Sequence, residues 1–230
     1  YAQHILKHIL RARAPGNRCN KREFFSAEDF ANITRQKSRK AFLKNQGGNS
    51  MTEIRWHGRG GLGAFTAARL LGCAVSLYEG KYALAFPSFG PERRGAPVFA
   101  FTRIDNKPIT DRSEVVECDI AIVLDDTLFG DPVRNGLKPG ATVIVNTTRD
   151  KAEFAIEGCN VVAVDATGLA LEILGRPITN VPLLGALIAA TGITSVEAVE
   201  AAIDNQLAPK LREKNKKLLK KTYEVVKEGL

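Results

Sequence analysis

The segment best suited to bind an anion is a glycine-rich turn that fits the pattern GxGxxG. It consists of Gly58, Arg59, Gly60, Gly61, Leu62 and Gly63. An apolar run at 54–57 predicts a strand before the turn, and residues 65–77 predict a helix after it, which is the context of a phosphate-binding turn. Glycines let the backbone approach an anion, and the first N–H groups of a helix attract it. The alternative is that these glycines only let the strand pack tightly against its helix.

A dinucleotide site also needs an acidic residue about 20 positions further on, at the end of the next strand, to bind the ribose. Glu79 lies near that distance. It falls before the next predicted strand, however, so the ribose-binding half of the pattern is missing. A self-contained NAD(P)-dependent oxidoreductase therefore stays only as an alternative.

A second segment, residues 86–97, is a loop rich in proline, glycine and arginine. Adjacent side chains of an extended loop point in different directions, so one of Arg93 and Arg94 can pair with Glu92 or another acid while the other binds an anionic group. Ser88 lies in the same loop, and we expect it to take part in the site. The alternative is that both arginines bind acids of a partner subunit or of the domain's own surface.

Polar residues follow several predicted strands, where ligands of open α/β sheets collect. Asp125, Asp126 and Thr127 come after the apolar run 120–124. The two carboxylates could bind Mg²⁺ or orient a hydroxyl, or Asp126 or Thr127 could cap a helix. The equivalent positions of later strands hold Asn146, Thr147 and Thr148, and then Asp165 and Thr167, which predict a helix start. His57 has no Ser, Cys or acid partner in the sequence, so no nucleophilic triad is predicted.

The elements that must position these residues are those of an α/β domain. From residue 51, short β-rich runs alternate with helical stretches. Strands are expected at 54–57, 83–86, 98–104, 120–124, 142–146 and 161–164, with a turn at 138–140. The final third is helical, with helix starts at Asn180, at the capping box 194–197 and at Pro209, and the lysines of the last helix form a solvated face balanced by nearby acids. We expect a Rossmann-like, three-layer α/β domain with a mostly parallel sheet and a helical C-terminal third.

The net positive charge of the chain comes entirely from its first 50 residues. The 230 residues carry a net charge of +8, and residues 1–50 hold 11 basic and 3 acidic residues against 22 of each in 51–230. The folded body therefore lacks the clustered positive charge that nucleic-acid binding requires. Residues 45–50 have the composition of a linker, and Met51 follows. This predicts a domain at 51–230 preceded by a basic extension at 1–50.

Three interpretations of the extension stay open. It is a genuine basic appendage, disordered or helical in part, or it comes from an over-extended reading frame with Met51 as the natural start, or it is an Arg-rich transit peptide. The four cysteines are Cys19, Cys73, Cys118 and Cys159, each more than 40 residues from the next. They indicate neither a disulfide framework nor a metal cluster. With no apolar run of membrane-spanning length and no secretory signal, we expect a cytoplasmic protein.

Three segments in order resemble the gamma subunits of pyruvate:ferredoxin oxidoreductases, in the 2-oxoacid:ferredoxin oxidoreductase family. They are 54–61 (IRWHGRGG), 79–82 (EGKY) and 86–98 (FPSFGPERRGAPV). The resemblance covers residues 51–230, and its loop is more similar to the pyruvate and branched-chain 2-oxoacid members than to the 2-oxoglutarate members. Leu62 stands where the family commonly has Gln, which removes a hydrogen-bonding side chain beside the expected anion site.

The resemblance implies a subunit, inactive alone, of an oxygen-sensitive heterotetramer of anaerobic metabolism. That complex converts pyruvate and coenzyme A (CoA) to acetyl-CoA and CO₂ and passes two electrons to ferredoxin. Thiamine diphosphate, Mg²⁺ and [4Fe-4S] clusters are then carried by the alpha, beta and delta subunits, and this chain holds no catalytic residue. CoA is the expected shared ligand. The residues expected to hold it are Gly58, Arg59, Gly60, Gly61, Gly63, Ser88, Arg93 and Arg94.

Overall fold

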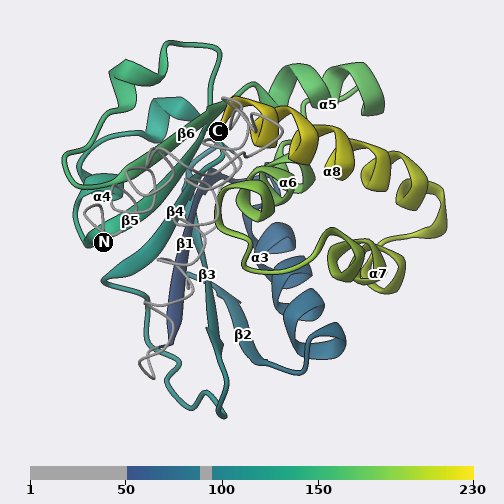
Figure 1. The fold of residues 1–230 in the computed structure, drawn as a ribbon, viewed down its shortest axis with the longest axis horizontal. Helices are drawn as coiled ribbons and strands as arrows, with labels where there is room; N and C mark the ends of the chain where they lie inside the picture. Colours follow the sequence, from purple (N-terminus) through teal and green to yellow (C-terminus); the bar gives the residue numbers. More distant parts are fainter. Residues whose placement is uncertain (1–50, 89–94) are drawn as a thin grey trace, which may run out of the picture. The chain divides into compact units, whose positions relative to one another are not determined.

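A twisted six-stranded sheet forms the centre of the domain (Figure 1). The computed structural model describes residues 51–88 and 95–230, so the expected extension at 1–50 lies outside the described residues. The strands are β1 (Thr52–Arg59), β2 (Tyr82–Pro87), β3 (Pro97–Asp105), β4 (Cys118–Val123), β5 (Leu137–Asn146) and β6 (Asn160–Val164). Their spatial order is β2-β3-β1-β4-β5-β6. β1, β4, β5 and β6 are mutually parallel, whereas β3 runs antiparallel to both β1 and β2, which confirms a mostly parallel sheet.

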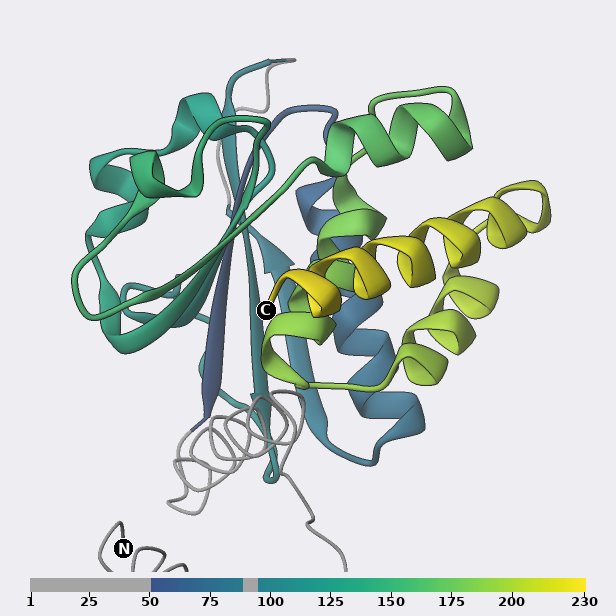
Figure 2. The same ribbon diagram turned by 45° about the horizontal axis from the view of Figure 1, so that its top comes forward.

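Long helices cover one face of this sheet (Figure 2). They are α3 (Ala64–Cys73), continued by the π-helical turn η1 (Ala74–Tyr78), then α5 (Ala166–Leu174), α6 (Asn180–Thr191), α7 (Val196–Gln206) and α8 (Pro209–Gly229). Helix α6 is buried on nearly every side, which explains why its sequence is apolar all round. Gly185 lets α8 pack closely, since a Cβ there would lie 2.5 Å from the Leu219 carbonyl oxygen. The expected helical C-terminal third is confirmed.

The opposite face carries a much thinner layer. Its helices are η2 (Asp126–Leu128), α4 (Asp131–Arg134) and η3 (Lys151–Phe154), each of three or four residues. They bury the alternate strand residues that point away from the long helices, among them Val123 and Val143, beneath Val133 and Phe154. Both faces of β4 are therefore buried, as its continuous apolar sequence predicts.

The expected turn at 138–140 is wrong in one respect, because β5 already includes these residues. The backbone N–H of Cys118 donates to the Gly136 carbonyl at 2.7 Å, so pairing with β4 starts before the turn. The register then shifts between Cys118 and Ile120, and Gly140 takes the left-handed φ of +79°. The proline and glycine thus make an irregularity inside a strand rather than the end of one.

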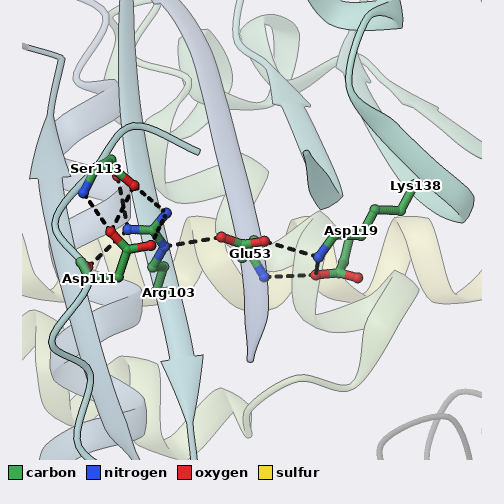
Figure 3. A network of polar contacts seen from close by, with 6 residues as sticks. All are labelled: Glu53, Arg103, Asp111, Ser113, Asp119 and Lys138. Atoms are coloured by element: carbon green, nitrogen blue, oxygen red, sulfur yellow. Dashed lines mark hydrogen bonds and ion pairs between the residues drawn. The ribbon is translucent and has the colours of Figure 1, made fainter. Parts of the chain in front are cut away.

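A network of charged groups joins four strands at the end of the sheet where β1 begins (Figure 3). Its members are Glu53 of β1, Arg103 of β3, Asp119 of β4, Lys138 of β5, and Asp111 and Ser113 of the loop between β3 and β4. Arg103 Nε lies 3.1 Å from Glu53 Oε1, and its Nη1 donates to the carbonyl oxygens of Asp111 and Ser113. Lys138 Nζ bridges Glu53 and Asp119 at 3.0 Å each.

Within the described ranges, every helix is too short or too polar to cross a lipid bilayer. The longest, α8, is strongly charged along its exposed side.

Replacing Arg103 tests the network. Arg103 is 2% exposed, so Arg103→Leu leaves the loop carbonyls without their donor and Glu53 with Lys138 as its one remaining cationic partner among the described residues. We expect a loss of about 1.5–3 kcal/mol in the free energy of unfolding, because the loop carbonyls lose hydrogen bonds from a charged donor and Glu53 loses one of these two cationic partners. Urea denaturation of the full chain measures it. Arg112→Ala, in the same loop but exposed, is the control and should change the value by less than about 0.5 kcal/mol.

Candidate functional site

The three segments singled out in the sequence meet at the carboxyl ends of the parallel strands. The glycine turn follows β1, Asp125 follows β4, and Gly95 and Ala96 form the last part of the second segment, just before β3. The Gly60 N–H donates to the Ala96 carbonyl at 2.9 Å, and the Gly95 N–H donates to the Gly60 carbonyl at 3.3 Å. Two segments more than 30 residues apart are thus joined by backbone hydrogen bonds.

Arg59 links all three segments through its guanidinium group. Its Nε lies 2.7 Å from Asp125 Oδ2, its Nη2 donates to Thr127 Oγ1 at 2.8 Å, and its Nη1 donates to the Gly95 carbonyl at 3.0 Å. About a third of the Arg59 side chain is exposed. In this arrangement its charge is already balanced by a carboxylate, so the residue holds the loops together.

Asp125 acts as a cap as well as an ion-pair partner. Its Oδ1 accepts hydrogen bonds from the Thr127 N–H at 3.0 Å and the Thr127 hydroxyl at 2.6 Å, at the start of η2. Desolvation raises the pKa of Asp125, but the hydrogen bonds from Thr127 and Arg59 outweigh it, so the pKa lies below its ordinary value. The neighbouring Asp126 accepts from the Thr147 hydroxyl at 2.6 Å. The segment does cap a helix, but the capping residue is Asp125 and not Asp126 or Thr127 as expected.

The glycines of the turn have different roles. A Cβ at Gly58 would lie 3.2 Å from the Ala64 Cβ, so this glycine serves the tight packing of β1 against α3. Gly63 has a φ of +82°, and a Cβ there would lie 2.6 Å from Asn180 Nδ2 of α6. Gly61, with a φ of +101°, faces open space. The strand-against-helix interpretation thus holds for Gly58, Gly63 is required instead by its positive φ and by the closeness of α6, and Gly61 leaves the backbone accessible.

No side chain of the described residues caps the backbone N–H groups at the start of α3. Its N-cap, Gly63, makes no side-chain capping bond, and the first turn contains no acidic residue. A helix of ten residues with a free N-terminus attracts negative charge through its N–H groups and its dipole. This is the electrostatic feature that the glycine turn predicts.

A pocket of about 380 Å³ lies beside the turn, at the ends of β4, β5 and β6. Its lining includes three carboxylates, from Asp125, Asp126 and Asp165, and no lysine or arginine from the described residues. Asn146 joins its walls, since its Nδ2 donates to the Leu124 carbonyl and to the Thr167 hydroxyl, both at 2.9 Å. Such a lining suits a ligand that donates hydrogen bonds and disfavours a phosphate. Asp165 caps α5 through the Gly168 N–H at 2.7 Å, which confirms the predicted helix start.

Glu79 has a structural role. Its Oε1 accepts from the Thr194 hydroxyl at 2.8 Å and from the Ser195 N–H at 2.9 Å, which ties the end of η1 to the start of α7. The only acid near the spacing of a ribose-binding residue is thereby occupied. This weakens the NAD(P) alternative further.

His57 is buried on β1, with its ring edge-on to Phe99 at 5.1 Å between centroids. Burial and the nearby Arg55 charge lower the pKa of His57 to about 3, so its imidazole is neutral at physiological pH. Its Nε2 has no hydrogen-bond partner among the described residues. Arg55, which the sequence analysis did not single out, donates to the carbonyls of Val133 and Asn135 and so anchors α4. The sequence signal that could have identified it is a charged residue in the middle of an apolar strand.

The other expected site residues are only partly placed. Ser88 Oγ donates to Glu114 Oε1 at 2.5 Å, which ties the start of the second segment to the loop before β4. Arg93 and Arg94 lie outside the described residues. No group of three or more His, Cys, Asp or Glu side chains suited to a metal occurs in 51–88 and 95–230.

Removing Arg59 should release the loops that it joins. In Arg59→Ala we expect hydrogen–deuterium exchange of the peptides containing Gly60, Gly95 and Thr127 to accelerate about ten-fold or more, because partly buried Asp125 loses its counter-charge. Arg149→Ala removes the exposed i,i+4 pair with Glu153 and is the control, with no change in those peptides. Equal protection in Arg59→Ala and the wild type would show that the loops do not depend on this side chain.

His57 should make stability depend on pH. The unfolded imidazole binds a proton below about pH 6.5, whereas the folded one does so only below about pH 3. The free energy of unfolding should therefore fall as pH drops from 6.5 towards 3, with a slope from this group of up to about 1.4 kcal/mol per pH unit. Urea denaturation between pH 4.5 and 7.5 should show a shallower dependence in His57→Phe, which keeps the aromatic contact with Phe99. Identical slopes in both proteins would rule out this contribution.

The chain matches the family model described as "Pyruvate ferredoxin/flavodoxin oxidoreductase" over residues 53–225. It is 51% identical over 179 residues to "Pyruvate/ketoisovalerate oxidoreductases common subunit gamma" of Thermococcus litoralis, covering 76% of this chain and 96% of the relative. It is 49% identical over 174 residues to "Pyruvate synthase subunit PorC" of Methanocaldococcus jannaschii, covering 75% and 96%. The crystal structure of pyruvate oxidoreductase subunit PORC from Thermotoga maritima superposes with a TM-score of 0.67 at 40% identity, covering 76% of this chain and 96% of that one. The chain belongs to the pyruvate ferredoxin/flavodoxin oxidoreductase family.

Proposed function

We propose that this chain is the gamma subunit of an oxidoreductase that converts pyruvate and CoA to acetyl-CoA and CO₂ and reduces ferredoxin. The observation that carries the proposal is the identity of about half of all aligned residues with gamma subunits, over 96% of their length. Thiamine diphosphate, Mg²⁺ and the [4Fe-4S] clusters belong, in this account, to the alpha, beta and delta subunits. The thiamine group supplies the carbanion chemistry, and the residues of this chain bind and orient.

The geometry of the site favours a subunit without its own catalytic centre over a self-contained dehydrogenase. Arg59 and Asp125 occupy the crevice between β1 and β4, where the chain's connections diverge to the two halves of the sheet and where related folds bind a pyrophosphate. Glu79 is engaged with α7, and His57 is neutral and buried. These features argue against NAD(P) binding in the usual crevice.

Within the complex, we infer that the glycine turn and the second segment hold the phosphates of CoA. The free N-terminus of α3 and the open backbone at Gly61 supply N–H donors. Gly60 pairs with Gly95, the residue that directly follows Arg94 in the sequence, so the turn and this loop belong to one site. The carboxylates of the neighbouring pocket favour the turn, rather than the pocket, as the place of a phosphate. Arg59 and Ser88 contribute by holding the loops.

A second substrate is favoured by one specific observation. Several relatives carry the name of a common gamma subunit of pyruvate and ketoisovalerate oxidoreductases. We therefore propose that this chain also serves a branched-chain 2-oxoacid enzyme, with the choice of oxoacid made by the thiamine-carrying subunits. The cytoplasm is the compartment that we propose for these complexes.

Reconstitution tests the proposal. The other subunits, isolated anaerobically without this chain, should not reduce methyl viologen with pyruvate and CoA, and adding the full chain should restore the activity. Substituting 2-ketoisovalerate for pyruvate, with the corresponding catalytic subunits, tests the shared role. Full activity without this chain would contradict the proposal.

Arg94 tests the CoA site. In the assembled complex, Arg94→Ala should raise the KM for CoA about ten-fold and leave the KM for pyruvate unchanged, because a charge-assisted hydrogen bond to phosphate is lost. Arg94→Lys keeps the charge without the forked geometry and should have a smaller effect. An unchanged KM for CoA together with a weakened complex would assign Arg94 to a subunit interface instead.

A further inference from the structure

Helix α8 carries its positive charge on two different sides. Its sequence contains eight basic and three acidic residues. On one side, Lys216 Nζ lies 2.7 Å from Asp204 Oδ2, and Lys220 Nζ lies 2.8 Å from Glu200 Oε1, both on α7. These two lysines fasten α8 to its neighbour, so the balance by nearby acids expected from the sequence is confirmed only for them among the described lysines of α8.

Four other lysines form a separate row, which we call the lysine stripe. It consists of Lys210, Lys214, Lys217 and Lys221, all exposed and without an ion pair among the described residues. Their spacing of four, three and four residues places them on one side of the helix, over about 16 Å at 1.5 Å per residue. A different side of α8 is buried in the core and contains Leu218, Leu219 and Val226.

This arrangement does not stabilise the helix. Like charges at i,i+3 and i,i+4 disfavour a helix by roughly 0.2–0.5 kcal/mol per pair, and the stripe contains three such pairs in a row. Glu213 and Glu224 lie three or four residues from members of the stripe and offset part of this repulsion, but neither forms an ion pair with it. Acids of α7 that could have neutralised it are used by Lys216 and Lys220. Between residues 210 and 221 the only acid is Glu213, and its Oε1 lies 3.5 Å from Lys216 Nζ; Glu224 and Glu228 follow the stripe. Over its own span the stripe is therefore a surface of excess positive charge, on a domain whose residues 51–230 are neutral overall.

Three kinds of anionic partner fit the stripe poorly. A membrane surface would need an apolar side of α8 to enter the lipid, and that side is buried in the core. Single-stranded nucleic acid is bound with interleaved aromatic side chains, and the stripe has none. A permanent subunit interface is apolar at its centre and poor in lysine. What remains is a transient encounter with an acidic protein, which is small, hydrated and steered by charge.

We propose that the lysine stripe of α8 is a docking surface for the acidic electron-carrier protein that accepts electrons from the complex. This rests on the proposed function, since an enzyme of this family must release electrons to a ferredoxin or flavodoxin. The stripe raises the rate of encounter by attracting the carrier to the complex. It takes no part in thiamine chemistry or in CoA binding.

The test uses the complete complex with Lys210, Lys214, Lys217 and Lys221 all changed to Gln, which has a similar helix propensity. We expect the KM for ferredoxin at low salt to rise about ten-fold and its dependence on ionic strength to flatten. The rate with methyl viologen, a small cationic acceptor, should be unchanged. The matched control changes the same four residues to Arg, which preserves the charge and should preserve the wild-type KM.

The outcomes separate the two proposals. Unchanged KM and salt dependence for ferredoxin in the Gln variant, with normal viologen reduction, would overturn the docking surface alone. Loss of the assembled complex in native mass spectrometry would show that the stripe is a subunit interface. Stripe-dependent binding to phosphatidylserine vesicles or to DNA, with an unchanged KM for ferredoxin, would identify another partner. Either result would overturn the docking surface. A wild-type complex that does not reduce viologen with pyruvate and CoA would contradict the proposed function and, with it, this occupant.

Discussion

The ion pair between Arg59 and Asp125 is the constraint on which the arrangement of the site depends. The two residues end β1 and begin the segment after β4, 66 positions apart, and their side chains meet at 2.7 Å. The same guanidinium reaches Gly95 and Thr127, so one side chain determines the positions of three loops. Because the pair is partly shielded from water and Asp125 keeps a low pKa, it stays charged across the physiological range.

This pair also occupies the place where a Rossmann-like sheet ordinarily binds its ligand. In open α/β sheets, the ligand lies in the crevice where the strand order reverses, here between β1 and β4. In this domain the protein's own side chains fill that crevice. The N-terminus of α3, which no described side chain caps, follows the glycine turn that pairs with Gly95 and Ala96, and the adjoining pocket is acidic. The loops at this crevice are those that we propose to hold the phosphates of CoA.

Local signals in the sequence predicted most of the fold. The continuous apolar run at 120–124, the glycine turn between a strand and a helix, and the helix start near 194–197 each depend on a few neighbouring residues, and each was confirmed. The predicted capping box itself was wrong, because Ser195 rather than Thr194 caps α7 and Thr194 donates to Glu79. The start of β5 was missed because pairing of Cys118 with Gly136 depends on a strand far away in the sequence. The partner of Arg59, the contacts of Glu79 and the burial of His57 could not be predicted, since each is decided by tertiary packing. The separation of the α8 lysines into paired and unpaired rows likewise required the position of α7.

We propose that this chain works as one subunit of an iron-containing, thiamine-dependent complex. Native mass spectrometry after anaerobic affinity purification of the full chain from its source, with iron determination on the same sample, tests it most directly. The account predicts a complex of this chain with alpha, beta and delta subunits that contains iron and thiamine diphosphate. An iron-free monomer or homo-oligomer of this chain would contradict it.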